Sequence, residues 1–188
     1  MVMVTLNCIP RALCTAIFAA YLGQSSPAAG AAGLDALLGM PISEDDILLT
    51  VSGELDLPET SRSDSTSIVF DRAMLEALPE HSFTTTTIWT AGEQTFTGVA
   101  LAELLAHFGI EGRLIKAVAL NDYSVDIPFD EIGPDAPIIA YERNGGAMSV
   151  RDKGPLWVVY PYDLDDSYRT ELVYQRSIWQ LDRLRILP

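Results

Sequence analysis

Cysteine is nearly absent from this chain of 188 residues, and both cysteines, Cys8 and Cys14, fall within its first fourteen positions. Because no cysteine follows, the rest of the chain has no thiolate metal ligand and no disulfide. Histidine is equally scarce: His81 and His107 show neither metal-ligand spacing nor the companions of a Ser-His-Asp triad. A glycine-rich phosphate loop and a dinucleotide-binding glycine pattern are also missing. These absences argue against enzymes that use a thiolate-bound metal, a Ser-His-Asp triad or a bound nucleotide.

Basic residues are few, since 12 Lys and Arg face 26 Asp and Glu and leave a formal net charge of −14. An excess of acid this large argues against binding to nucleic acid or to anionic membranes. Most of the basic residues nevertheless gather in the C-terminal part of the chain, where they could form a local pocket for a small anion. Ordinary salt bridges explain any one of them equally well. The residues in question are Arg143, Arg151, Lys153, Arg169, Arg176, Arg183 and Arg185.

Long apolar runs are missing too. The run from Ala12 to Leu22 is too short to span a bilayer but has the length of a signal-peptide core. The small residues Ala29-Gly30-Ala31 follow, and no Arg-Arg pair indicates the twin-arginine route. We therefore predict a general secretory signal over residues 1–31, cleaved near Ala31, and a periplasmic or secreted protein with no stable membrane anchor. A buried N-terminal helix is the alternative.

Residues 32–188 are predicted to form a single domain of the α+β class, because many short strand patterns accompany two or three helices. Asp71 is expected to cap a helix over Arg72 to Leu78. Apolar spacing of three and four residues predicts a helix from Val99 to Phe108, which Gly109 ends. Asn144-Gly145-Gly146 is typical of a hairpin turn. Strands are expected at Ile47 to Gly53, Ser67 to Phe70, Phe83 to Trp89, Gln94 to Thr97, Leu114 to Leu120, Ser124 to Ile127, Pro137 to Tyr141, Leu156 to Tyr160 and Ile178 to Ile186.

Three segments carry a resemblance to a known family. They are Phe96-Thr97-Gly98-Val99-Ala100-Leu101-Ala102-Glu103-Leu104-Leu105, then Asn121-Asp122-Tyr123 with Ile127-Pro128, and the block from Asn144-Gly145 to Pro161. Together they resemble the oxidoreductase molybdopterin-binding domain, the fold of sulfite oxidases, from about Ile47 to Leu187. The resemblance implies a mixed β-sheet fold and a molybdopterin cofactor. It is more specific for fold than for activity, because one fold can serve many functions.

In that family a cysteine thiolate ligates molybdenum a few residues before a tryptophan. Counting back from Trp89 puts Thr85 at that position, within a run of four threonines. A neutral hydroxyl is a poor substitute for a thiolate at a soft-ligand metal centre. Thr85 could instead bond a water or a phosphate, or the run could simply be strand sequence. The expected ligand is molybdopterin or another pterin, and the missing thiolate argues against molybdenum.

Further candidates for the cofactor site follow from the same segments. Asn121 and Asp122 offer the donors and acceptors that suit a pterin edge, and Tyr123 adds a stacking surface; an Asx turn is the alternative. Arg151 and Lys153 could hold a phosphate that Gly154 allows to approach closely, although Trp157 stands where the family often has arginine. Arg176 could face the pocket or the solvent. Trp89 and Trp179 are expected in the core, with Trp89 also a candidate contact.

Three functions remain open from the sequence. The first is an exported, noncatalytic module that binds a pterin or another small anion. The second is a molybdopterin-dependent oxidoreductase whose metal is held without cysteine, so that the cofactor supplies the chemistry. The third is an interaction scaffold without a ligand, for which no protein partner can be named. The third predicts a closed site beside Asn121 and Lys153, whereas binding requires an open cleft.

Overall fold

The computed structural model of the protein describes residues 42–53 and 67–188. The predicted signal over residues 1–31 lies outside the described residues, so its cleavage stays a prediction. The strands are β1 (Leu49–Gly53), β2 (Ser67–Phe70), β3 (Glu80–Thr86), β4 (Glu93–Ala100), β5 (Leu114–Ala119), β6 (Ser124–Pro128), β7 (Ile138–Arg143), β8 (Gly146–Ala147), β9 (Trp157–Val159) and β10 (Leu181–Leu187). The α-helices are α2 (Arg72–Glu76), α3 (Leu101–His107) and α4 (Glu171–Arg176), and the 3₁₀ turns are η1 (Glu44–Asp46), η3 (Phe129–Glu131), η4 (Val150–Asp152) and η5 (Asp166–Tyr168).

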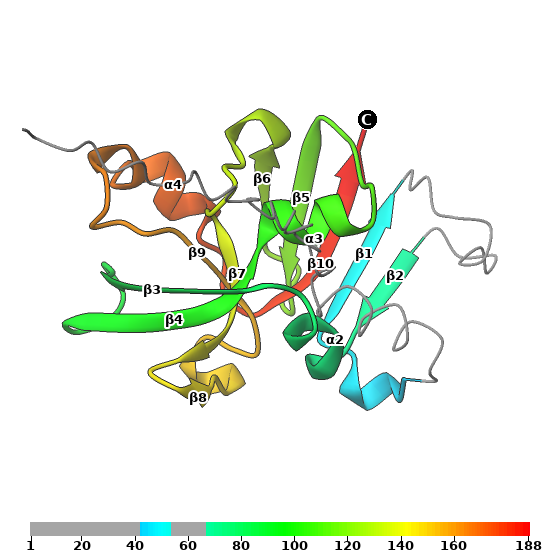
Figure 1. Ribbon diagram of the computed structural model, residues 1–188, viewed down its shortest axis with the longest axis horizontal. Coiled ribbons are helices and arrows are strands. Elements are labelled where there is room, and N and C mark those ends of the chain that lie inside the picture. The colour runs from blue at the N-terminus through cyan, green and yellow to red at the C-terminus, as the bar shows by residue number, and fades with distance from the viewer. Residues whose placement is uncertain (1–41, 54–66) are drawn as a thin grey trace, which may run out of the picture.

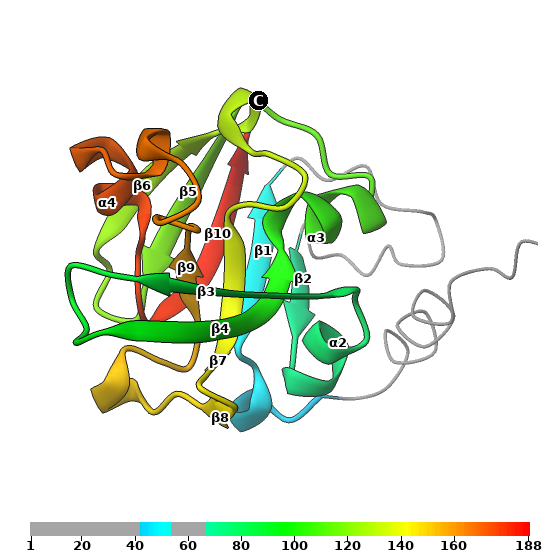
Figure 2. The same ribbon diagram turned by 60° about the vertical axis from the view of Figure 1, so that its left-hand side comes forward.

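Two sheets form the body of the molecule (Figure 1). The first has the strand order β2-β1-β10-β5-β6, in which β1 pairs parallel with β10 and every other pair is antiparallel. The second has the order β3-β4-β7-β8, and β9 also pairs with β7, over residues 138–140 and opposite β4, whereas β8 pairs with residues 142–143. In Figure 2 the long β3–β4 hairpin runs across the front of the first sheet. Two sheets with few short helices confirm the α+β class.

The helix predicted over residues 99–108 begins two residues later than expected. Val99 and Ala100 still belong to β4, where they pair with Ile139 and Ile138 of β7. The cross-strand ladder therefore outcompetes the local helical pattern, and α3 starts at Leu101. Its end is as predicted, because Gly109 adopts φ 59° and its N–H donates to the carbonyl oxygen of Ala106.

Two predicted strands have shorter or shifted ends. β3 stops at Thr86 rather than Trp89, because the hydroxyl of Thr87 accepts a bond from the Trp89 N–H and turns the chain. β10 begins at Leu181 rather than Ile178, because Gln180 adopts φ 53° and interrupts the extended backbone.

The predicted hairpin turn is confirmed, since Asn144 and Gly145 both have positive φ between β7 and β8. Asp71 also caps α2 as predicted, accepting from the Met74 N–H at 2.8 Å.

Trp157 lies at the centre of the core and is fully buried on β9. Its ring packs edge-on against Phe96 and Trp89, with centroid distances of 5.3 and 5.9 Å. Its indole N–H donates to the carbonyl oxygen of Ser177. This one side chain thus connects the second sheet to the segment after α4. Among the described residues, no helix is long and apolar enough to cross a membrane.

Candidate functional site

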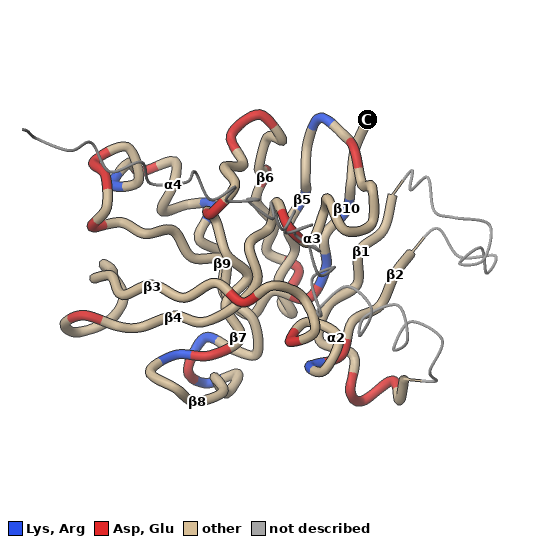
Figure 3. The backbone as a smooth tube through the Cα atoms, viewed as in Figure 1, with Lys and Arg blue, Asp and Glu red and all other residues tan. Residues whose placement is uncertain are grey.

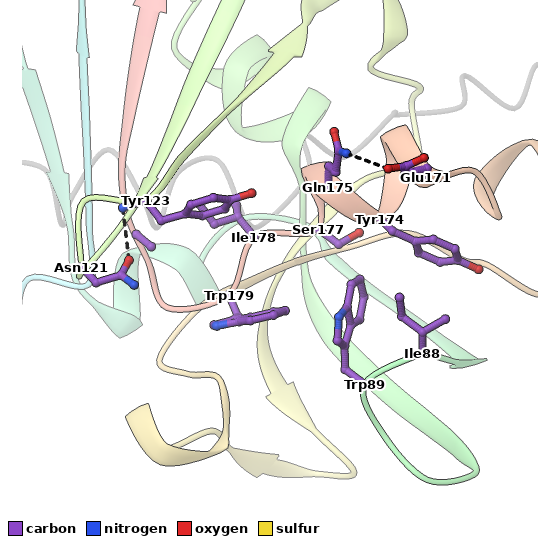
Figure 4. Close-up of a pocket in the computed structure, with 11 residues that line it drawn as sticks. Ile88, Trp89, Asn121, Tyr123, Glu171, Tyr174, Gln175, Ser177, Ile178 and Trp179 are labelled. Carbon is purple, nitrogen blue, oxygen red and sulfur yellow. Dashed lines mark hydrogen bonds between the residues drawn. The ribbon is translucent and has the colours of Figure 1, made fainter.

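A pocket of about 660 Å³ opens between α4, the end of the β3–β4 hairpin and the turn that joins β5 to β6. Figure 4 shows its aromatic walls and the polar side chains between them. The lining residues are Ile88, Trp89, Ala119, Asn121, Tyr123, Glu171, Tyr174, Gln175, Ser177, Ile178 and Trp179. A cavity of this size with apolar walls and a few polar groups is suited to a small organic ligand.

Helix α4 supplies one wall of the pocket through a single face. Glu171, Tyr174 and Gln175 stand three and four residues apart, so that their side chains share one side of the helix. Thr170 begins this helix, since its hydroxyl accepts a bond from the Val173 N–H at 3.3 Å. The helix is too short to show the repeated spacing of apolar residues from which a helix is predicted. No helix was therefore predicted at this position, although Thr170 is a residue type that favours helix starts.

Hydrogen bonds fix the inner end of the pocket to the core. The Ser177 hydroxyl accepts a bond from the Tyr162 hydroxyl at 2.6 Å and donates to the Val173 carbonyl oxygen at 2.8 Å. Burial raises the pKa of the Tyr162 hydroxyl, so that it stays protonated and remains a donor. With the bond from Trp157 to the Ser177 backbone, the hydroxyl and the carbonyl of this buried serine are both satisfied. The pocket wall is therefore preorganised rather than loosely packed.

The aromatic walls of the pocket pack edge to face. Trp89 lies 5.6 Å from Trp179 and 5.8 Å from Tyr174 between ring centroids, at interplanar angles of 74° and 88°. Such T-shaped contacts are favourable for aromatic pairs and hold the rings in place. Trp179 remains 37% exposed and Tyr123 remains 54% exposed. Both rings therefore keep surface for a ligand. Trp89 packs against the core as predicted, whereas the prediction that Trp179 lies in the core is wrong, because its ring is exposed at the pocket.

Three of the nine predicted contact residues line this pocket: Trp89, Asn121 and Tyr123. The Asn121 side chain accepts a bond from the Tyr123 N–H at 3.1 Å, which is the Asx turn expected as the alternative. That turn uses the side-chain oxygen of Asn121 and leaves its amide group to donate toward the pocket (Figure 4). The structural and the binding interpretation of Asn121 are therefore compatible.

Thr85 is buried on β3 and lies outside the set that lines the pocket. Its hydroxyl oxygen lies 3.3 Å from a carboxylate oxygen of Asp163, and it accepts a bond from the Asp163 N–H at 3.1 Å. Asp163 also accepts bonds from the backbone N–H and the hydroxyl of Thr86, at 2.5 and 2.8 Å, and from Arg169 at 2.6 Å. At the position that the resemblance assigns to the metal ligand, this chain has a hydrogen-bonded connection between β3 and the loop after β9.

The carboxylate of Asp163 makes an expected contribution to acid stability. The bond from the Thr86 N–H, followed by that from the Thr86 hydroxyl, lowers the pKa of Asp163 to about 2 from an ordinary 3.8. Because the folded-state pKa is depressed, this stabilisation is complete above the unfolded value and is lost as the pH falls from 3.8 toward 2. We expect Asp163→Asn to lower the melting temperature at neutral pH and to flatten its fall between pH 4 and pH 2.

Thermal unfolding followed by circular dichroism from pH 2 to pH 7 measures this effect. Asp166→Asn is the matched control, because the Asp166 side chain is 98% exposed and reaches Arg169 only at 3.7 Å. An equally steep loss of stability in wild type and Asp163→Asn below pH 4 would contradict the assignment.

Two further predicted residues are engaged by ion pairs. Asp122 accepts a bond from Arg183 at 2.6 Å, which raises the pKa of that guanidinium further. Arg176 is 7% exposed, pairs with Glu131 and donates to the Asp126 carbonyl oxygen at 3.2 Å. The bond from Arg176 lowers the pKa of Glu131. Neither Asp122 nor Arg176 lines the pocket, so that a ligand role for them stays a prediction.

The remaining predicted residues lie around η4, beside β8, where Figure 3 shows a group of basic positions. Arg151 is exposed. Lys153 places its ammonium 4.7 Å from the ring centroid of Trp179 and 5.8 Å from that of Trp157. Gly154 has no room for a side chain, since a Cβ atom there would lie 2.0 Å from the Met148 carbonyl oxygen. The close approach expected at Gly154 is therefore made by the chain's own backbone.

In a comparison with protein families, the model described as oxidoreductase molybdopterin binding domain matches residues 44–164. That range contains β1 to β9, Trp89 and Asn121, and it ends before α4 and Trp179. A comparison with curated proteins gives no significant match.

Molybdopterin, which this family binds, fits the site only in part. The aromatic walls and the amides of Asn121 and Gln175 suit a flat heterocycle. The metal end does not fit, because residues 42–53 and 67–188 contain no cysteine and the Thr85 hydroxyl is already bonded to Asp163. In the same residues, no group of three His, Cys, Asp or Glu side chains could hold a metal ion.

The family model matches well over half of the chain, and the α+β architecture agrees with it. The chain therefore belongs to the oxidoreductase molybdopterin-binding domain family.

Proposed function

We propose that this protein is an exported, noncatalytic binding module of the molybdopterin-binding fold, and that its ligand is a pterin-like heterocycle. The observation that carries this proposal is the open aromatic pocket beside Asn121. A scaffold without a ligand would be expected to fill that space with its own side chains. A preformed cavity with partly exposed rings instead supports binding.

The donor set supports binding without redox catalysis. A molybdenum centre in this family is tied to the protein through sulfur, and a threonine hydroxyl is a weak ligand for such a metal. Thr85 is moreover committed to Asp163 in a buried contact. The chemistry available from the described pocket residues is stacking and hydrogen bonding, which holds a ring but does not transfer electrons. The small-anion alternative is less well supported, because no Lys or Arg among the described residues lines the pocket.

The composition of the native protein tests this proposal. The protein would be purified from the culture medium or periplasm of its own organism, and its intact mass would be determined. Elemental analysis would measure molybdenum, and fluorescence after acid oxidation would measure pterin. We expect a mass that corresponds to cleavage near Ala31, a pterin-like compound and no stoichiometric molybdenum.

Each departure from that result has a defined meaning. Stoichiometric molybdenum with oxyanion or sulfoxide turnover would replace the proposal by the oxidoreductase alternative. Neither pterin nor metal, together with no thermal shift on adding pterins, would leave the scaffold. An uncleaved chain retained in the cytoplasm would overturn the export part alone.

A further inference from the structure

We infer that the aromatic pocket selects its ligand by charge. It binds neutral or positively charged ring compounds that carry no phosphate, and it excludes anionic ones. Glu171 is the residue whose carboxylate decides which ligand charge is favoured. The inference rests on the proposed function, because it concerns the same pocket. The family's cofactor carries a phosphate, so membership of the family would instead suggest a pocket that accepts anions.

Among the described residues that line the pocket, Glu171 is the one with a formal charge, and the others are aromatic, aliphatic, amide or hydroxyl side chains. Its carboxylate accepts a long hydrogen bond of 3.3 Å from the Gln175 amide, and this uncharged donor does not neutralise the carboxylate. In Figure 4 the Glu171–Gln175 pair lies on the side of the pocket across from Trp89 and Trp179. A ligand on those rings therefore lies in the field of a carboxylate.

The basic residues nearest in sequence to the lining are directed elsewhere. Arg176, on the same helix, is itself buried and pairs with the exposed Glu131. Arg183 is held by Asp122 and Asp182, at 2.6 and 2.7 Å. Lys153 approaches the Trp179 ring but is not part of the pocket lining. Among the described residues no Lys or Arg lines the pocket to replace the water of a ligand phosphate, and the Lys153 ammonium, 4.7 Å from the Trp179 ring centroid, is engaged by that ring.

Electron-rich ring faces add to the same preference. Trp89, Tyr174 and Trp179 line the space, and the Trp89 ring stands at steep angles to the other two. The faces of such rings attract positive charge and repel negative charge. An amino-bearing heterocycle satisfies both the rings and the Glu171 carboxylate, which can accept from ring N–H and amino groups. Glu171 and Trp179 lie beyond residue 164, where the family match ends, so this selectivity belongs to the C-terminal part of the chain.

Two pterins of nearly the same shape test the inference. The full mature protein would be titrated with 6-hydroxymethylpterin, which is uncharged at its substituent, and with pterin-6-carboxylate, which is anionic there. We expect the first to bind about tenfold more tightly at low salt, corresponding to one unfavourable charge contact near the protein surface. Glu171→Gln should reduce this ratio to about threefold or less, and Glu171→Lys should reverse it.

Glu103→Gln is the matched control, because it removes the same charge from the exposed side of α3, outside the pocket lining. It should leave the ratio unchanged. Equal or tighter binding of the carboxylate by the wild type overturns the charge inference and leaves the proposed function standing. Failure of both pterins to bind overturns the proposed function itself.

A second measurement reports the pocket's charge without any pterin. The tryptophans are Trp89 and Trp179 in the pocket and Trp157 in the core, so that quenchers in water reach only the first two. We expect caesium to quench their fluorescence more efficiently than iodide, relative to free tryptophan, and Glu171→Lys to reverse that order. Stronger quenching of the wild type by iodide than by caesium would overturn the inference even if no pterin binds.

Discussion

Replacing Trp157 by alanine is expected to lower the free energy of unfolding by about 3–5 kcal/mol, the range for large aromatic residues deleted from a packed core. The ring is fully buried and contacts Phe96, Trp89 and Trp179. Its removal leaves a cavity between three aromatic neighbours and deprives the buried Ser177 carbonyl of a donor. Because both effects act in the same direction, we expect the loss to fall in the upper part of that range.

Urea unfolding measures this loss as a lower midpoint at unchanged slope. Trp157→Phe is a more conservative variant for comparison, because it keeps an aromatic ring in the cavity and loses mainly the indole hydrogen bond. It should fold even if Trp157→Ala does not, with a loss between that of Trp157→Ala and zero. A change below about 1 kcal/mol in Trp157→Ala would show that Trp157 does not join the second sheet to the pocket wall as described.

Replacing Trp179 by alanine is expected to weaken pterin binding by about thirtyfold, or about 2 kcal/mol, the size typical of a tryptophan at a binding hot spot. The ring offers a ligand surface that is already held in place by Trp89. Because Trp179 is 37% exposed, its loss should cost far less stability than the loss of Trp157. The two tryptophans therefore separate stability from binding.

Isothermal titration with 6-hydroxymethylpterin measures the change in affinity, and urea unfolding checks the stability. Trp179→Phe should restore most of the affinity, because a stacking face remains. Leu164→Ala is the control, since this side chain is 77% exposed and outside the pocket lining. An affinity unchanged in Trp179→Ala would place the ligand elsewhere and would remove the pocket from the proposal.

The elements predicted from local pattern are those whose residues settle their own conformation. Asp71 caps a helix with its own side chain, and Asn144-Gly145 reverses the chain because both residues accept positive φ. Errors arose where a distant strand competed with the local pattern. Val99 and Ala100 look helical alone but complete a ladder with β7, whose residues lie about forty positions later in the sequence.

The candidate site was predicted less completely than the fold. Trp89, Asn121 and Tyr123, three of the predicted contact residues, line the pocket, and their contact with a cofactor stays a prediction. The wall supplied by α4 was missed, because a six-residue helix carries too few residues to show a period. The engagement of Thr85 by Asp163 and of Arg176 by Glu131 joins residues 78 and 45 positions apart. Such pairings between distant segments cannot be read from composition or spacing.

The sequence alone determined the family, the α+β class and the lack of any cysteine beyond position 14, since these depend on residue identity and on short-range pattern. Only the tertiary structure decided which side chains face the same space. Trp89, Asn121, Glu171 and Trp179 meet there because two sheets and a short helix pack on Trp157. Packing also brings Arg176 and Arg183 against carboxylates outside the pocket, and for Arg176 the reason is burial, because a buried charge needs a partner at close range.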